Sequence, residues 1–212
     1  MRPRVHLLAL SVKDCMGCYP CRVSFLERKR QLVKDELSHV AAQLIARNGY
    51  EETTVEQIVE AAGVSRRTFF RYFRSKEDVI VEVLTAVGEH AESVIDGRPA
   101  DEAPALSVRH ALMELTVHYR GFPEKALALS KLIIGTPALR ARYLDRQFQW
   151  RQSVAARLQA RSGTDPVRAA LIAGVAFTAL DVALAAWVAS DGAADLSDLV
   201  QRTLDLAKID EL

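Results

Sequence analysis

The stretch TTVEQIVEAAGVSRRTFFRYFRSKEDVI, residues 53–80, contains two short helical patterns separated by a glycine. Thr54 is followed three residues later by Gln57, the spacing of a capping box, in which each side chain binds the backbone N–H of the other residue. The pair predicts the start of a helix over residues 55–62. Gly63 ends that helix, because glycine readily adopts a positive φ.

A second helical pattern follows this turn. Ser65 is the expected N-cap, and the helix covers residues 66–73. Phe69 and Phe73 are four residues apart, so we expect both rings to pack inward. Two short helices joined by a glycine-containing turn predict a helix-turn-helix, whose second helix enters the major groove of DNA.

Local charge supports this interpretation, whereas the formal net charge of +1 says nothing about nucleic acid. Residues 65–76 contain five basic side chains and no acidic one. Arg66 and Arg67 lie in the first turn of the second helix, where a guanidinium can bind a guanine edge with two hydrogen bonds. The side chains suited to phosphates are Thr68, Tyr72 and Lys76.

Composition favours helices along the whole chain, because half of the residues are apolar, glycine and proline are few, and no alternating β pattern lasts. A helical pattern over residues 25–48 precedes the helix-turn-helix, and one over 76–95 follows it. A break over 96–104 is rich in proline, glycine and acids. Five more helices are expected, over residues 105–121, 123–134, 137–161, 166–190 and 196–209.

The expected fold is therefore all-α. A three-helix DNA-binding domain with the helix-turn-helix covers residues 25–75, and a larger six-helix domain covers residues 76–212. The apolar segment 169–190 is about as long as a membrane span, but Asp181 at its centre favours a buried helix of a cytoplasmic protein. No membrane partner is expected.

Residues 1–24 are expected to be a leader that is disordered or lies upstream of the native start. They carry Cys15, Cys18 and Cys21, a spacing that suits a metal or cluster and leaves metal or redox sensing as the alternative function. A closed tetrahedral site needs a fourth ligand, and His6 lies too far away, so we expect no bound metal and no cofactor.

The stretch over residues 30–80 closely resembles the DNA-binding signature of TetR-type regulators, in the A-G-V-S turn, the T-F-F-R-Y-F helix and the S-K-E start of the next helix. The subtype R-R-T-F-F-R-Y-F is similar to actinobacterial members. Arg67 stands where such proteins often have a small residue, and Phe70 where they often have Tyr. By this resemblance the positions that approach DNA are Thr54, Ser65, Arg66, Arg67, Thr68, Phe70, Tyr72 and Lys76.

The resemblance implies a homodimeric repressor that binds a palindromic double-stranded operator and is released by a ligand. An activator is an open alternative, because the position of the operator decides the sign. An enzyme is not expected, since the chain has no phosphate-binding glycine loop and neither an H-E-x-x-H nor a G-x-S-x-G motif.

The larger domain is the ligand-binding and dimerisation domain of the proteins that the chain resembles. For a small hydrophobic or aromatic effector, polar groups on apolar stripes make the candidate pocket residues Met113, His118, Tyr119, Gln147 and Trp150. The last two helices have small and apolar faces that suit an isologous four-helix interface. The candidate dimer residues are Ala173, Ala176, Leu180, Leu184, Leu199 and Thr203.

Overall fold

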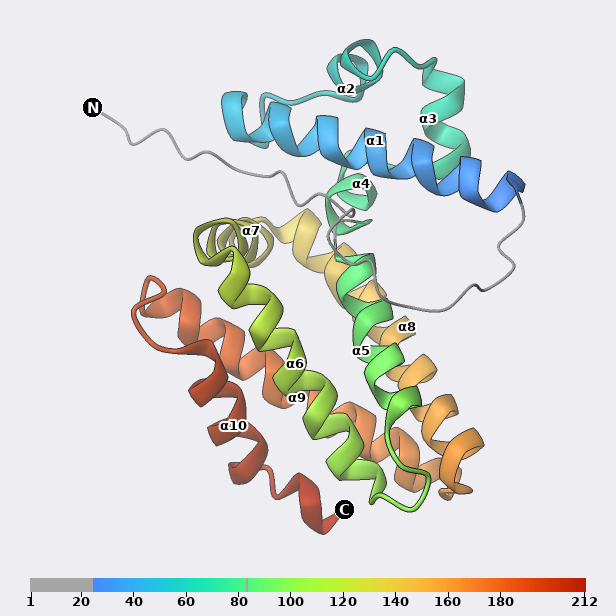
Figure 1. Cartoon of the computed structure of the whole chain (residues 1–212). Helices are drawn as coiled ribbons and strands as arrows, with labels where there is room; N and C mark the ends of the chain where they lie inside the picture. The colour runs from blue at the N-terminus through green and yellow to red at the C-terminus, as the bar shows by residue number, and fades with distance from the viewer. Residues whose placement is uncertain (1–24, 83) are drawn as a thin grey trace. The chain divides into compact units, whose positions relative to one another are not determined.

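The computed structural model describes residues 25–82 and 84–212, and all regular elements within them are helical, which confirms the all-α prediction (Figure 1). The leader at residues 1–24, with Cys15, Cys18 and Cys21, lies outside the described residues. The chain divides between Ala86 and Val87 into two compact units.

The first unit contains four helices, and α5 begins at its end. Their bounds are α1 (Phe25–Asn48), α2 (Val55–Ala61), α3 (Arg66–Tyr72), α4 (Lys76–Glu82) and α5 (Thr85–Gly97). The second unit continues with α6 (Pro104–Gly121), α7 (Pro123–Gly135), α8 (Pro137–Ser162), α9 (Pro166–Ala189), α10 (Leu196–Leu206) and the short 3₁₀ helix η2 (Ile209–Glu211). Four of these helices have Pro in the first turn, where its missing N–H costs no hydrogen bond.

The core of the first unit is one apolar cluster to which all four helices contribute. In α1 the inward residues recur at helical spacing, and Gly49, at φ +91°, ends the helix as predicted. The buried members of the cluster are Leu37, Val40, Ala41, Ile58, Phe69, Phe73 and Val79. Lys34 adds an ion pair from α1 to the buried Glu82 of α4, with Nζ 2.8 Å from Oε1.

The single helix predicted over residues 76–95 is wrong, because α4 ends at Glu82 and α5 begins at Thr85. The last four residues of α4 are all buried, so the helix packs on several sides. Its length is therefore set by this packing and not by one amphipathic stripe. The helix belongs with the first unit, since Val79 is part of that core. The boundary between units thus lies at Ala86, beyond the residue 75 expected from the sequence.

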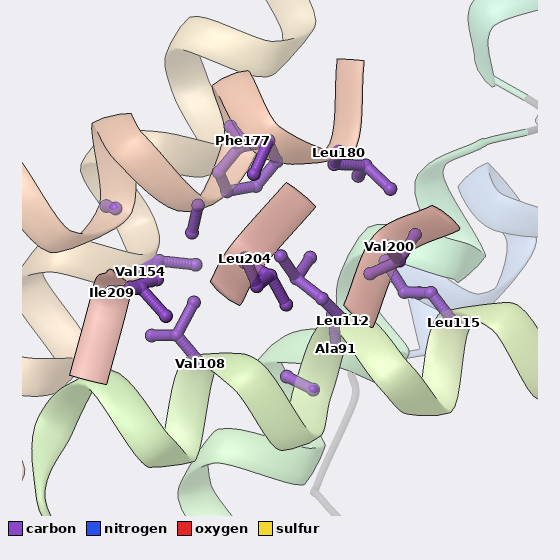
Figure 2. Close-up of a cluster of buried hydrophobic side chains, with 14 of the residues drawn as sticks. Ala91, Val108, Leu112, Leu115, Val154, Phe177, Leu180, Val200, Leu204 and Ile209 are labelled. Atoms are coloured by element: carbon purple, nitrogen blue, oxygen red, sulfur yellow. The ribbon is translucent and has the colours of Figure 1, made fainter. Parts of the chain in front are cut away.

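The core of the second unit lies among α6, α8, α9 and α10 (Figure 2). The five predicted helices are present, but the last ends at Leu206 and η2 follows as a separate turn. Val108 and Leu112 of α6 meet side chains of the other helices, and Leu204 of α10 projects into the middle of the cluster (Figure 2).

Helix α9 is apolar on more than one face. Pro166–Ala189 is long and apolar enough to cross a membrane by length and composition, yet half of its most apolar window is buried inside the structure. Ala173 and Ala176 are fully buried against the neighbouring helices, as expected of a core helix. Its exposed side carries Val167, Leu171 and Val182, which are 76%, 50% and 55% exposed.

The C-terminal end of the chain is held to α6 by one guanidinium. Arg109, which is 8% exposed, donates two hydrogen bonds to Asp210, at 3.0 and 2.7 Å, and one to Asp205, at 2.8 Å. The two-bond contact with Asp210 in η2 has the geometry that makes Arg–carboxylate pairs strong. Arg109 thereby connects α6, α10 and η2.

We expect Arg109→Met to lower the free energy of unfolding by about 2 kcal/mol, because the two aspartates are half-exposed and lose their partner without being buried alone. Urea denaturation followed by circular dichroism measures the change. Arg202→Met, at an exposed position of α10, is the matched control and should leave the midpoint almost unchanged. Equal losses in both variants would contradict this role of Arg109.

Candidate nucleic-acid interface and ligand site

The N-terminus of α2 has the predicted capping box. Thr54 Oγ1 accepts a hydrogen bond from Gln57 N at 3.2 Å, and Gln57 Oε1 accepts one from Thr54 N at 2.9 Å. Two backbone N–H groups that lack partners inside the helix are therefore satisfied by side chains. The helix starts at a fixed residue, which fixes the position of the turn that follows.

The turn between α2 and α3 also follows the predicted chemistry. Gly63 adopts φ +64°, a conformation that costs a side-chain-bearing residue about 1 kcal/mol or more. Ser65 then caps α3, its Oγ accepting from Thr68 N at 3.0 Å and lying 2.9 Å from Thr68 Oγ1. Thr68 is thus held close to the N-terminus of α3, where backbone N–H groups favour an anion.

Two phenylalanines orient α3. Phe69 is fully buried and Phe73 is 3% exposed, and their ring centroids lie 5.7 Å apart. This confirms the prediction that both rings pack inward. Both arginines of the first turn are exposed. Arg67 lies on the side away from the rings, whereas Arg66, three residues before Phe69, lies on their side and meets α2.

Arg66 is held from two directions. Its Nη1 lies 3.0 Å from Glu56 Oε1 of α2, and its guanidinium lies over the Phe70 ring at 5.5 Å from the centroid. Phe70 is 46% exposed and meets Phe69 edge-on, with centroids 5.2 Å apart. Phe70 therefore forms a platform beneath Arg66, a role that its sequence position alone did not reveal.

Arg71 pairs with its neighbour Tyr72 in a similar way. Arg71 Nη2 donates to Tyr72 Oη at 2.9 Å, and its guanidinium lies over the Tyr72 ring at 4.7 Å. Tyr72 is among the residues predicted from the sequence, whereas Arg71 and Glu56 are not. In the sequence, Arg71 is distinguished only as one of five basic residues. No spacing rule relates Glu56 on one helix to Arg66 on the next.

Lys76 has partners that differ from the phosphate expected for it. Its Nζ donates to the backbone oxygens of Tyr50 and Thr53, at 2.9 and 3.1 Å, and lies 4.1 Å from the centroid of the Tyr50 ring. The Tyr50 hydroxyl donates in turn to Glu77, and burial raises the pKa of Tyr50 well above its usual range. Lys76 therefore joins the start of α4 to the turn after α1, which leaves one of its three N–H groups for a phosphate.

The second unit contains the predicted ligand residues, and they differ in environment. Gln147 is fully buried, whereas Met113, Tyr119 and Trp150 are partly buried against the apolar core. The side chain of His118 lies outside the described residues.

Trp150 connects three helices of this unit. Its indole stacks on Phe177 of α9, with centroids 6.4 Å apart and planes inclined by 22°. On another side it approaches Gly88 of α5 so closely that a Cβ added there would lie 2.3 Å from Nε1. Tyr119 of α6 meets Trp187 of α9 edge-on at 6.1 Å. Aromatic rings from α6, α8 and α9 are thus assembled around the predicted pocket residues.

Four of the six candidate dimer residues lie in the core of their own chain. Ala173 and Ala176 are fully buried in the chain's own core, and Leu180 and Leu184 are each 8% exposed, so these side chains are not available to a second copy. Leu199 and Thr203 of α10 are partly exposed. The small residues pack α9 against its own neighbours, and the opposite, exposed side carries Val167, Leu171 and Val182.

Within residues 25–82 and 84–212, no group of three or more His, Cys, Asp or Glu side chains is arranged to hold a metal ion. The cysteines of the N-terminal segment are outside this range.

Comparisons with known proteins agree with this geometry. Residues 37–83 match the model of the bacterial regulatory proteins of the tetR family, and residues 102–209 match that of the MftR C-terminal domain. TcmR, an HTH-type transcriptional regulator of Streptomyces glaucescens, is 35% identical over 66% of this chain and 64% of its own length. The putative mycofactocin biosynthesis transcriptional regulator MftR of Mycobacterium tuberculosis is 29% identical over 76% of this chain and 80% of its own.

The fold itself has solved counterparts. The crystal structure of FadR from Thermus thermophilus, a TetR family transcriptional repressor, was solved in complex with lauroyl-CoA. It aligns with this chain with a TM-score of 0.54 at 22% sequence identity. The alignment covers 82% of this chain and 92% of that one. At this identity the likeness establishes the arrangement of helices and nothing finer.

We expect Lys76→Met to lower the free energy of unfolding by about 1–3 kcal/mol, because the Tyr50 and Thr53 carbonyls lose a charged donor. Thermal or urea denaturation measures this loss. Lys29→Met, at an exposed position of α1, is the control for a lost positive charge. If the variant kept its stability but its DNA binding depended less steeply on salt, the main role of Lys76 would be to contact a phosphate rather than to stabilise the fold.

Proposed function

Because the chain belongs to the tetR family of bacterial regulatory proteins and is a DNA-binding transcriptional regulator, we propose that it is a homodimeric repressor released from its operator by a small apolar or aromatic effector. The observation that carries the proposal is the exposed first turn of α3, in which both Arg66 and Arg67 reach the surface next to the buried Phe69. An activator differs only in where its operator lies.

The DNA-reading surface consists of the first turn of α3 and its surroundings. Arg66, supported by Phe70, and Arg67 read base edges, since a bidentate guanidinium–guanine contact gives about 1–3 kcal/mol of discrimination. The phosphate contacts come from hydroxyls around the two helix N-termini and from the remaining N–H of Lys76. The proposed contact residues are Thr54, Ser65, Arg66, Arg67, Thr68, Phe70, Tyr72 and Lys76.

The proposed dimer uses the exposed side of α9. Val167, Leu171 and Val182 follow one another at helical spacing and leave a long apolar strip in water, which a second copy would cover. Leu199 and Thr203 of α10 lie at the edge of this interface. A two-fold dimer matches a palindromic operator, because two recognition helices must reach half-sites about one helical turn, ~34 Å, apart.

The effector binds within the second unit, near Tyr119, Gln147 and Trp150, with Met113 and His118 as further candidates. Binding there shifts the population of dimers away from the spacing that fits the operator, by no more than its difference in affinity for the two states. The relatives are described as regulators rather than as enzymes, and none of these descriptions supports metal or redox sensing. A cytoplasmic location follows from an operator on the chromosome.

The first test of this function replaces Arg66 and Arg67 with Ala together. The ratio of operator to random-sequence affinity should fall by about tenfold or more for each arginine, because the base contacts are lost while phosphate contacts remain. Fluorescence anisotropy with an operator duplex chosen by binding-site selection measures the ratio.

Arg140→Ala together with Arg202→Ala is the matched control, since it removes the same charge from exposed positions of the second unit. Its ratio should equal that of the wild type. Full discrimination in the Arg66/Arg67 variant would show that α3 does not read the operator.

The second test places a carboxylate on the proposed dimer surface. Leu171→Glu and Val182→Glu should each give a monomer, because each substitution buries charge twice across a two-fold interface. Light scattering after size exclusion measures the mass. Leu144→Glu is the control, because Leu144 is 49% exposed on α8 and lies away from this surface. A dimer in both α9 variants would place the interface elsewhere.

A further inference from the structure

A partly buried polar cluster lies within the second unit, beside the aromatic rings. Tyr143, Gln147 and Arg151 follow one another at intervals of four on α8, so they share one face of that helix. Asp181 faces them from the middle of α9, on a helix that is otherwise apolar. A carboxylate in such surroundings is costly and needs partners.

Gln147 is the centre of this cluster, and both of its amide N–H groups are used. Its amide nitrogen donates to Tyr143 Oη at 2.9 Å and to Asp181 Oδ1, and its Oε1 accepts from Arg151 Nη2 at 3.1 Å. Tyr143 Oη and Asp181 Oδ1 therefore surround the same nitrogen. They lie close enough together for one small polar group of a ligand to contact both.

The other three members keep unused capacity among the described residues. Arg151 Nε is buried and has no hydrogen-bond partner. The Tyr143 oxygen accepts from Gln147, but its own O–H has no acceptor, and Asp181 Oδ2 has no donor. Buried polar groups are satisfied in the great majority of cases. Arg151 Nε is the buried one of these three groups, so it indicates a polar partner from outside the chain.

Burial affects the ionisation of these groups. Burial raises the pKa of Tyr119 to about 12 and also raises that of Asp181. It raises the pKa of Tyr143 well above its usual range, with the nearby Tyr119 and Asp181 adding to the effect. Both tyrosines are thus neutral O–H groups, yet each ring keeps part of its surface accessible.

Two aromatic pairs lie beside this cluster. The Trp150–Phe177 stack lies one turn along α8 and α9 from Gln147 and Asp181, and the Tyr119–Trp187 pair completes the group. Gly88 admits the Trp150 indole against α5. Flat rings of this kind favour an aromatic ligand, through stacked and edge-to-face contacts.

We propose that this cluster binds the hydroxyl group of a phenolic effector. A phenol O–H donates to Asp181, and its oxygen accepts from Tyr143 O–H and Arg151 Nε–H, so that one group satisfies all three. A carboxylate ligand would be repelled by Asp181, and a hydrocarbon would leave the three groups unpaired. The inference rests on the proposed function, since it names the chemical class of the effector of that regulator.

Tryptophan fluorescence is a sensitive probe of binding, because the two tryptophans of the chain, Trp150 and Trp187, each belong to one of these aromatic pairs. Titrations of tryptophan fluorescence would compare para-butylphenol with butylbenzene and with para-butylbenzoate. The phenol should bind the full-length wild type about tenfold more tightly than either, since one pair of satisfied buried groups contributes about that factor. It should also release the selected operator duplex.

Two variants test the assignment of residues. Asp181→Asn keeps an oxygen for Gln147 but loses the free acceptor, and Tyr143→Phe loses the free donor, so each should remove most of the preference for the phenol. Asp198→Asn makes the same chemical change at an exposed position of α10 and should bind like the wild type.

Equal or absent binding of the phenol, tighter binding of the benzoate, or an unchanged preference in both variants would overturn the inference. Each of these results leaves the proposed function intact as long as the wild type binds a selected operator. A wild-type chain that selects no DNA sequence would instead remove the proposed function, whatever the phenol does.

Discussion

The burial of Phe69 and Phe73 against α1 is the constraint on which the DNA-binding unit depends. A seven-residue helix such as α3 has no stability of its own, because nucleation is costly and few hydrogen bonds follow. The two rings place it on the core formed by Leu37 and Ile58. Burial of one large aromatic side chain stabilises the folded state by about 1.5–3 kcal/mol. The two rings therefore contribute more stability than the exposed ion pairs of the same helix.

The same constraint sets the chemistry of the outer surface. The first turn presents Arg66 and Arg67 to water, and the cap at Ser65 fixes where that turn starts. The contacts of Arg66 with Glu56 and Phe70 then limit its freedom before any DNA is present. The Gly63 turn connects this short helix to α2, and Lys76 fixes the start of α4 against the turn after α1.

Local chemistry made much of this unit predictable from the sequence. The capping box, the Gly63 turn and the inward rings depend on residues at most four apart, and all were confirmed. The end of α4 was missed because burial on several sides has no single period. The partners of Lys76 are 23 and 26 residues away, a distance that no local pattern covers.

The second unit was harder for a related reason. Helix α9 is apolar on both sides, so composition identified it as central but did not say which side faces its own core. Small residues such as Ala173 suited either packing, and the structure places them inside. The pairing of Asp181 with Gln147, 34 residues apart, likewise became visible only in the fold. The sequence had marked each residue separately, as a polar group in an apolar pattern.

The central claim is that a two-fold dimer reads double-stranded DNA through α3. Binding-site selection with the full chain and random-sequence duplexes tests it most directly. The account predicts enrichment of a two-fold symmetric sequence with half-sites about one helical turn, ~34 Å, apart and guanines at the positions nearest Arg66 and Arg67. No enrichment, or a single asymmetric site bound by a monomer, would contradict it.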